Sequence, residues 1–198
     1  MFNFEMKEMI LKYESELFKK AQTMEKVSAD YNELDKPISN YVVDAEKVSG
    51  CPIEGHNGHW SGPRGNSLWR PDRNEKPLRY NPEDYSWGEI LDKYKIEGVV
   101  YNNGDPDFSE IAKGVVTIDD FTDDRESNFA QADEAMAKHK GCNPEDVKQW
   151  RIENGYTWHE CRDCRTIQKV PRGVHNNMDH TGGVSEYKKN NRTDGITI

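Results

Sequence analysis

The strongest constraint on the fold lies in residues 155–183, GYTWHECRDCRTIQKVPRGVHNNMDHTGG. Two short runs that favour β-strands, YTWHEC and RTIQKV, are separated by only a few residues, as in a β-hairpin. Pro171 follows the second run, and a proline can open a short helix over PRGVHNNM because its ring suits the first helical turn. The segment therefore predicts a strand–strand–helix unit rich in possible metal ligands.

One interpretation of this unit is a structural zinc site held by Cys161, Cys164, His175 and His180. A two-cysteine, two-histidine finger has about twelve residues between its pairs, whereas Cys164 and His175 here enclose ten. Two histidines five residues apart also point about 140° away from each other on a helix. A non-enzymatic binding module with a structural zinc is thus the alternative function.

The other interpretation is a nuclease site built from different residues. His159 and Glu160 end the first strand, and His175 and His180 follow the second. Hydrolysis of a phosphodiester needs a base near neutral pH and a cation that stabilises charge on the phosphate and leaving oxygens. Imidazole and carboxylate groups suit one divalent ion, Zn, Mg or Mn. One ion and one base are the smallest set of groups that can catalyse this hydrolysis.

The sequence also resembles a known family, the HNH superfamily of ββα-metal nucleases. The resemblance is to the subgroup with a Trp-His-His or Trp-His-Glu signature, found as C-terminal toxin domains of bacterial polymorphic toxins, including the LXG type. It rests on TWHEC, TIQKVP and VHNNMDHTGG, and upstream on GNSLWRPD (65–72), residues 106–133 and VKQWRIENGYTWHEC (147–161). Several motifs in one order make it more specific than a lone triplet.

Residue roles follow from the resemblance by position. The superfamily places a metal ligand on the first strand, directly followed by the general base, which implies His159 as ligand and Glu160 as base. A glutamate base departs from the usual pattern, so the reverse assignment stays open. We favour the reverse, because a nearby divalent ion lowers the pKa of a carboxyl group and weakens it as a base. His175 matches the helix ligand, and His180 is the second ligand or a phosphate contact.

Other residues near this unit have weaker assignments. The middle asparagine that gives HNH its name has no clear match, and Thr166 and Gln168 are nearest to its position. Four basic residues along the hairpin are candidate phosphate contacts: Arg162, Arg165, Lys169 and Arg172.

The rest of the chain predicts an α+β fold. Apolar residues recur at helical spacing over residues 2–36 and stop at Pro37. Residues 49–86 are rich in Gly, Pro, Asn and Ser and are expected to lack regular structure; their His56 and His59 are weak ligand candidates. Further helices are expected at 87–94, after Asp123 and within 142–155, with strands at 98–101 and 114–118 around a turn in NNGDP.

Charge bears on the partners of the chain. The formal net charge is −9, which opposes unassisted attraction to nucleic acid. Residues 151–198, however, contain eight Lys and Arg against six Asp and Glu. The slightly basic C-terminal part is compatible with a nucleic-acid substrate. The acidic remainder, residues 1–150, is compatible with a basic protein partner.

These observations lead to one set of expectations. Residues 1–48 would form a helical N-terminal segment and residues 49–198 a nuclease toxin domain, with the ββα-metal core at 155–183. The domain would cleave DNA, or else RNA, and would be neutralised by an immunity protein. The first residues are too charged for a Sec-type signal peptide or a membrane span, so we expect a toxin delivered by another route into the cytoplasm of a target cell. Oligomeric state is not predicted.

Overall fold

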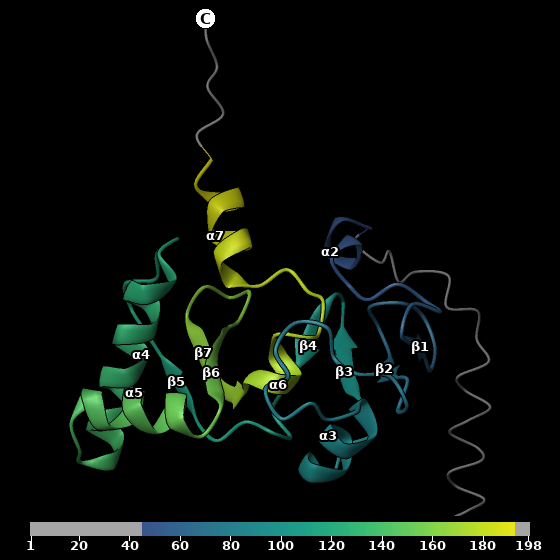
Figure 1. The fold of residues 1–198 in the computed structure, drawn as a ribbon. Helices are drawn as coiled ribbons and strands as arrows, with labels where there is room; N and C mark the ends of the chain where they lie inside the picture. The colour runs from purple at the N-terminus through teal and green to yellow at the C-terminus, as the bar shows by residue number, and fades with distance from the viewer. Residues whose placement is uncertain (1–44, 193–198) are drawn as a thin grey trace, which may run out of the picture. The chain divides into compact units, whose positions relative to one another are not determined.

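The computed structural model describes residues 45–192, and the helix predicted over residues 2–36 lies outside this range. Within the described range the chain forms two antiparallel sheets and several helices (Figure 1). The α+β class expected from the sequence is confirmed. No helix in residues 45–192 is both long and apolar enough to cross a membrane.

The first sheet contains four strands in sequential order: β1 (Gly58–Trp60), β2 (Leu68–Pro71), β3 (Val99–Asn102) and β4 (Asp105–Asp107). A short helix, α2 (Ala45–Ser49), precedes this sheet, and α3 (Trp87–Tyr94) lies between β2 and β3 in the chain. β3 and β4 are joined by Asn103 and Gly104, which both have positive φ angles. This is the backbone of a tight hairpin turn, and it confirms the turn expected in NNGDP. The strand that follows this turn, β4, was not predicted, and the predicted strand at 114–118 belongs to the other sheet as β5.

The prediction that residues 49–86 lack regular structure is wrong for β1 and β2. Each strand carries one tryptophan, Trp60 or Trp69, and the two rings lie 5.2 Å apart between centroids. Tyr101 of β3 packs edge-on against Trp60 at 5.0 Å. Burial of three large rings outweighs the turn-forming composition of the surrounding loop, because each aromatic side chain removes a large apolar area from water.

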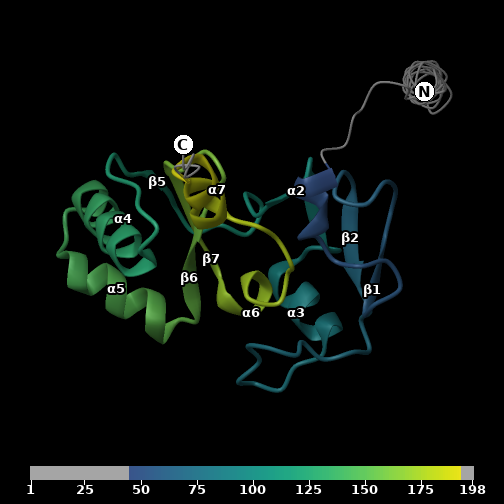
Figure 2. The same ribbon diagram turned by 90° about the horizontal axis from the view of Figure 1, so that it is seen from above.

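The second sheet contains three strands in the order β5 (Val115–Thr117), β7 (Thr166–Pro171) and β6 (Tyr156–Glu160). β6 and β7 form the predicted hairpin, with His159 opposite Gln168. Asp163 stabilises its turn by accepting hydrogen bonds from the backbone N–H groups of Arg165 and Thr166. Two helices, α4 (Arg125–Lys140) and α5 (Pro144–Glu153), lie beside this sheet (Figure 2).

The β6–β7 hairpin separates two hydrophobic cores. Val170 belongs to the core of the first sheet, with Tyr101 and Phe108. Trp158 and Ile167 belong to the core formed with α4 and α5. Because successive side chains of a strand point to opposite faces, neighbouring residues of β6 face different cores.

The second core holds a buried ion pair. Nε and Nη2 of Arg151 donate to the two carboxylate oxygens of Asp133 at 3.2 and 2.8 Å. Nε1 of Trp158 donates to the same carboxylate at 2.8 Å. This group of three links α4, α5 and β6 immediately next to His159.

Two helices complete the described chain. The expected helix after Pro171 is short: α6 spans Arg172–His175, and His180 lies in the loop beyond it. The Asn-Asn-Met-Asp run that follows favours turns over helix. A further helix, α7 (Gly183–Asn190), was not predicted, and it buries Val184 while leaving its lysines exposed.

Candidate metal centre

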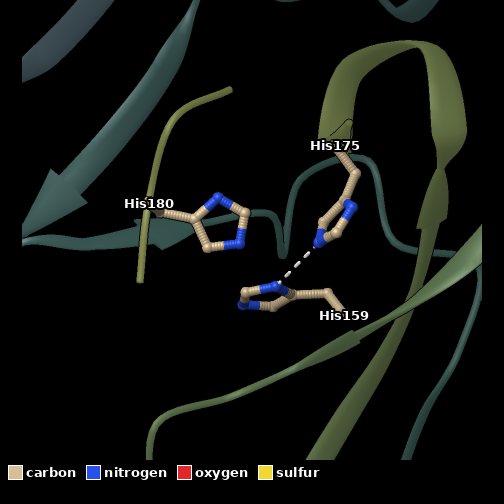
Figure 3. Close-up of side chains that lie close together, drawn as sticks. All are labelled: His159, His175 and His180. Carbon is tan, nitrogen blue, oxygen red and sulfur yellow. Dashed lines mark hydrogen bonds between the residues drawn. The ribbon is translucent and has the colours of Figure 1, made fainter. Parts of the chain in front are cut away.

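Three histidine side chains converge beside the β6–β7 hairpin. His159 comes from β6, His175 ends α6, and His180 lies in the loop before α7 (Figure 3). One possible ligand atom from each residue lies within 4.8 Å of the others. Within residues 45–192 this is the one group of three or more His, Cys, Asp or Glu side chains with such a spacing.

The rings are arranged around a common centre. Their centroids are 5.2 Å apart for His159 and His175, and 5.0 Å apart for each pair that includes His180. Phe108 follows β4 and is fully buried. Its ring packs against all three imidazoles, with centroid distances of 4.9, 5.5 and 5.9 Å. Phe108 therefore forms an apolar floor that keeps water from one side of the cluster.

Hydrogen bonds orient two of the imidazoles. Nδ1 of His175 lies 3.1 Å from Oδ1 of Asn176, and Nδ1 of His180 lies 2.8 Å from the carbonyl oxygen of Met178. A ring nitrogen that donates to an oxygen carries the proton, so Nε2 of each ring keeps its lone pair. This is the arrangement that commonly fixes a metal-binding histidine.

Burial keeps the cluster neutral. It lowers the pKa of His159 well below its usual value and that of His175 to about 3, and it lowers the pKa of His180 as well. The neighbouring imidazoles and the guanidinium of Arg125 act in the same direction on His159. Neutral imidazole is the form that binds a metal ion, so the three side chains fit a divalent cation without prior loss of a proton to solvent.

The cluster opens into a cleft of about 780 Å³. Its lining includes His175 and His180 together with Arg125, Tyr80, Arg79 and Ser185. An anion in the cleft would therefore meet both imidazole and guanidinium groups. The cleft gives a substrate direct access to two of the three histidines.

Glu160 follows His159 in the chain but faces the other core. Its Oε1 accepts a hydrogen bond of 2.7 Å from Nδ2 of the fully buried Asn128, and its Oε2 lies 3.3 Å from Nε of Arg125. Burial raises the pKa of this carboxyl group, against the opposing effects of Asn128 and Arg125. The structure does not bring Glu160 into the group of three histidines.

The two cysteines of the hairpin turn lie apart from the histidine cluster. The Cys164 thiol donates to the carbonyl oxygens of Arg162 and Gly183, and burial raises the pKa of the Cys161 thiol to about 12. Neither cysteine belongs to a group of side chains with metal-like spacing in residues 45–192. The residues proposed for a zinc finger are thus divided between two places.

The four basic residues predicted to contact phosphate occupy different environments. Lys169 is 2% exposed, and its ammonium lies over the rings of Trp150 and Trp158, on the face of the hairpin opposite His159. Arg165 is exposed and pairs with Asp119.

Arg172 stacks on Tyr80, a residue of the cleft, with its guanidinium carbon 5.1 Å from the ring centroid. Arg162 is largely buried and donates to the backbone and hydroxyl oxygens of Thr181. His56 and His59 are exposed and belong to no metal-like group in the described residues.

Sequence reasoning missed three residues that shape this site: Phe108, Arg125 and Asn128. All three lie far from the hairpin in sequence, and Asn128 reaches Glu160 across 32 residues. Their motif, within residues 106–133, was recognised as part of the resemblance, but no local spacing indicates what its members contact.

Comparison with known proteins finds a family model that resembles part of the chain. No curated protein matches the chain. Residues 98–182 match the family model described as the DNase/tRNase domain of colicin-like bacteriocin. The matched range runs from the start of β3 to just beyond His180, and it includes all three histidines, Glu160, Arg125 and Phe108. Over residues 98–182, the part that holds the histidine cluster, this chain is therefore similar to a nuclease toxin domain.

Proposed function

We propose that this chain is a metal-dependent nuclease of the HNH type and acts as an antibacterial toxin domain. The observation that carries the proposal is the convergence of His159, His175 and His180 at an open cleft. The match of residues 98–182 to the DNase/tRNase domain of colicin-like bacteriocin supports the same class of activity. The strand–strand–helix arrangement of β6, β7 and α6 supports the HNH assignment and its Trp-His-Glu subgroup.

The donor set indicates which ion would bind. Three neutral imidazoles are the ligands of transition ions, above all zinc, whereas Mg²⁺ prefers oxygen ligands and bound water. We assign His159, His175 and His180 as the three protein ligands. A divalent ion there would supply a Lewis acid for a phosphate oxygen and the leaving oxygen.

The geometry supports a different assignment of base and ligand from the one that we favoured from the sequence. His159 shares the cluster with the other two histidines, while Glu160 faces Asn128 and Arg125. We therefore propose His159 as a ligand and Glu160 as the general base, because Arg125, which lines the cleft, lies 3.3 Å from Oε2 of Glu160 and brings this carboxylate to the edge of the cleft. Oε1 is occupied by Asn128, so Oε2 is the oxygen that would accept the proton from the attacking water.

Arg125 is the residue best placed to hold the scissile phosphate. It lines the cleft beside His175 and His180, and its side chain is 65% exposed. A planar guanidinium can donate two parallel hydrogen bonds to a phosphate. A phosphate bound to Arg125 would weaken its ion pair with Glu160 and leave Oε2 free to accept a proton.

The wider biological role rests on the matched family. A bacteriocin-like nuclease is lethal to the cell that makes it unless an immunity protein blocks it, and we include such a partner in the proposal. The match describes both DNase and tRNase domains, so either substrate is compatible with it; we favour DNA. A delivered toxin acting in the target-cell cytoplasm completes the proposal.

The decisive experiment is incubation of the purified protein with plasmid DNA and, separately, with total RNA that includes tRNA. We expect cleavage that a chelator abolishes and added Zn²⁺ or Mn²⁺ restores. The His175→Ala variant should be inactive, while His139→Ala, which changes an exposed histidine on α4, should keep full activity. Cleavage that survives in His175→Ala, or no cleavage of either polymer with any ion, would overturn the proposal.

A further inference from the structure

A second hollow lies next to the cleft and is strongly basic. It has a volume of about 370 Å³ between α2 and α7. Its lining contains five basic residues: Lys47, Arg162, Lys188, Lys189 and Arg192. We call this hollow the basic groove. In Figure 1 both helices that border it lie in the upper half of the view.

The basic residues come from separate parts of the chain. Lys47 lies on α2, Arg162 lies in the β6–β7 turn, and Lys188, Lys189 and Arg192 lie in the last turn of α7 or just after it. Lysines at the end of a helix are explained by the helix dipole alone. That explanation does not account for Lys47 and Arg162, which the fold brings to the same hollow from elsewhere.

The charge of the groove is opposite to that of the whole chain. Its lining has five basic residues and one acidic residue, Glu186, while the formal net charge of the chain is −9. Oδ1 of Asp105 lies 2.8 Å from Nε of Arg162, so this carboxylate offsets one of the five positive charges. A positive hollow on an acidic protein concentrates attraction for an anion at one place, because the rest of the surface repels it.

Arg162 provides a fixed charge beneath the groove. Its side chain is 8% exposed, and Nη2 donates to the hydroxyl and carbonyl oxygens of Thr181 at 2.6 and 3.1 Å. Its Nη1 is buried without a hydrogen-bond partner among the described residues. An arginine held in this way keeps its place beneath the groove, with part of its charge offset by Asp105.

The basic groove and the cleft of the histidine cluster are neighbours. Ser49 and Ser185 line both hollows. Thr181, which Arg162 holds, is the residue after His180. A chain with phosphates at regular intervals could therefore lie in the groove and reach the cluster without leaving the surface.

We infer that the basic groove binds the phosphodiester backbone of the substrate strand, at nucleotides beyond the bond that is cleaved. This inference rests on the proposed nuclease function and adds a path for the substrate. Exposed lysine and arginine side chains with nearby serine and threonine hydroxyls are the groups that contact phosphates without reading sequence. The adjacency of the groove to the cleft, through Ser49 and Ser185, favours a polymer of phosphates over an acidic protein, which would need no access to the histidines.

The test compares two double variants with the same change in charge. Lys188→Gln with Arg192→Gln alters the groove, and Lys138→Gln with Lys140→Gln alters exposed lysines at the end of α4. Binding is measured by fluorescence anisotropy with a labelled 20-base-pair DNA duplex and a labelled 20-nucleotide RNA. A chelator is present throughout, so that neither probe is cut.

The salt dependence of binding reports the phosphate contacts. For duplex DNA, the slope of log affinity against log salt should become shallower by about 1.8 in the groove variant, and for a single strand by about 1.4. The α4 variant should keep the slope of the parent protein. Equal slopes for the parent and the groove variant would refute the proposal that the groove binds phosphates. An equal decrease of the slope in the groove and α4 variants would refute it as well. A groove variant that binds both probes normally but fails to bind an immunity protein would assign the groove to that partner instead.

Cleavage separates failure of the groove from failure of the proposed function. A dinucleotide substrate is too short to occupy both hollows, so the groove variant should cleave it at the parental rate. The same variant should show a raised KM for the 20-base-pair duplex with little change in kcat. If the parent protein cleaves nothing, the nuclease proposal fails, while the binding data still decide whether the groove holds a phosphodiester chain.

Discussion

Nδ1 of His159 lies 3.1 Å from Nε2 of His175, a distance at which one of the two nitrogens must carry a proton. Because Nδ1 of His175 is directed at Asn176, the proton belongs on His159. An ion bound between these nitrogens would take the place of that proton, and His159 would then carry its hydrogen on Nε2. The contact thus marks one edge of the proposed metal site.

Metal binding should depend on the histidines and not on the thiols. We expect one Zn²⁺ per chain by isothermal titration calorimetry, and no measurable binding in His180→Ala. Asn176→Ala removes the partner that orients His175, so affinity should fall by about 10–100-fold, the usual effect of losing such a partner. Cys161→Ser with Cys164→Ser is the control and should bind zinc normally; loss of zinc in that variant would favour the structural zinc site instead.

Glu160→Gln should abolish cleavage without weakening metal binding. The substitution keeps the shape of the side chain but removes its ability to accept a proton, which costs about 10²–10⁴-fold in rate for a positioned base. Glu160→His should keep part of the activity, because an imidazole can also accept a proton. Rates on plasmid DNA and zinc affinities are measured on the same preparations. Weakened zinc binding in Glu160→Gln, with rescue of the rate by excess metal, would restore Glu160 as a ligand.

Asp133→Ala should destabilise the fold strongly. It leaves the buried guanidinium of Arg151 and the indole N–H of Trp158 without their shared acceptor. Breaking a buried ion pair by removing one partner costs about 3–5 kcal/mol. Urea unfolding measures the loss, and the exposed pair of Arg165 and Asp119 offers a matched control. Asp119→Ala should change the free energy of unfolding little, and equal effects of the two variants would contradict this account.

The metal-free protein should lose stability in mild acid through His175. The pKa of this residue falls from 6.5 to about 3 on folding, so below pH 6.5 the unfolded chain binds a proton that the folded chain does not. The neutral imidazole of His175 therefore contributes fully to the free energy of unfolding above pH 6.5, and this contribution is lost as the pH falls toward 3. Between pH 7 and pH 5 the loss is at most about 2 kcal/mol.

His175→Gln removes this titration and provides the comparison. In urea unfolding with a chelator present, the stability of His175→Gln relative to the parent should improve between pH 7 and pH 5. His139→Gln, on the surface of α4, should follow the parent at both pH values. A constant difference between His175→Gln and the parent would show that His175 is not buried in the neutral form.

Expression in a bacterial cytoplasm should stop growth. The wild-type chain under an inducible promoter should reduce colony counts by several orders of magnitude, while His175→Ala, with the same fold but no metal site, should be tolerated. Immunoblotting checks that both proteins accumulate. Normal growth with abundant wild-type protein that cleaves DNA in the tube would rule out the toxin role and leave the nuclease activity intact.

The local parts of this structure could be predicted from the sequence. The β6–β7 hairpin, the short helix after Pro171 and the turn at Asn103 and Gly104 all follow from residue preferences within a few positions. The three histidines were singled out for the same reason, since they lie in one short stretch. The short strands with Trp60 and Trp69 were missed because their partners across the sheet, and not their neighbours in sequence, stabilise them.

The surroundings of the site could not be predicted in the same way. Lys169 was expected at the phosphate because it lies near the histidines in sequence, but alternation along β7 places its ammonium over the ring of Trp158. Asn128 and Arg125 approach Glu160 only because α4 packs on the second sheet. Such contacts depend on the packing of whole elements, which no short window of sequence contains.

The hydrogen bond between Nε1 of Trp158 and Asp133 fixes the alignment of β6 in its sheet. A shift of β6 by one position would exchange the faces of His159 and Glu160, placing a carboxylate under Phe108 and an imidazole beside Asn128. The same shift would turn the indole of Trp158 out of its core and away from its acceptor. Assembly of the histidine cluster and correct strand pairing therefore depend on the same alignment of β6, and misaligned chains should be loosely packed and sensitive to proteases.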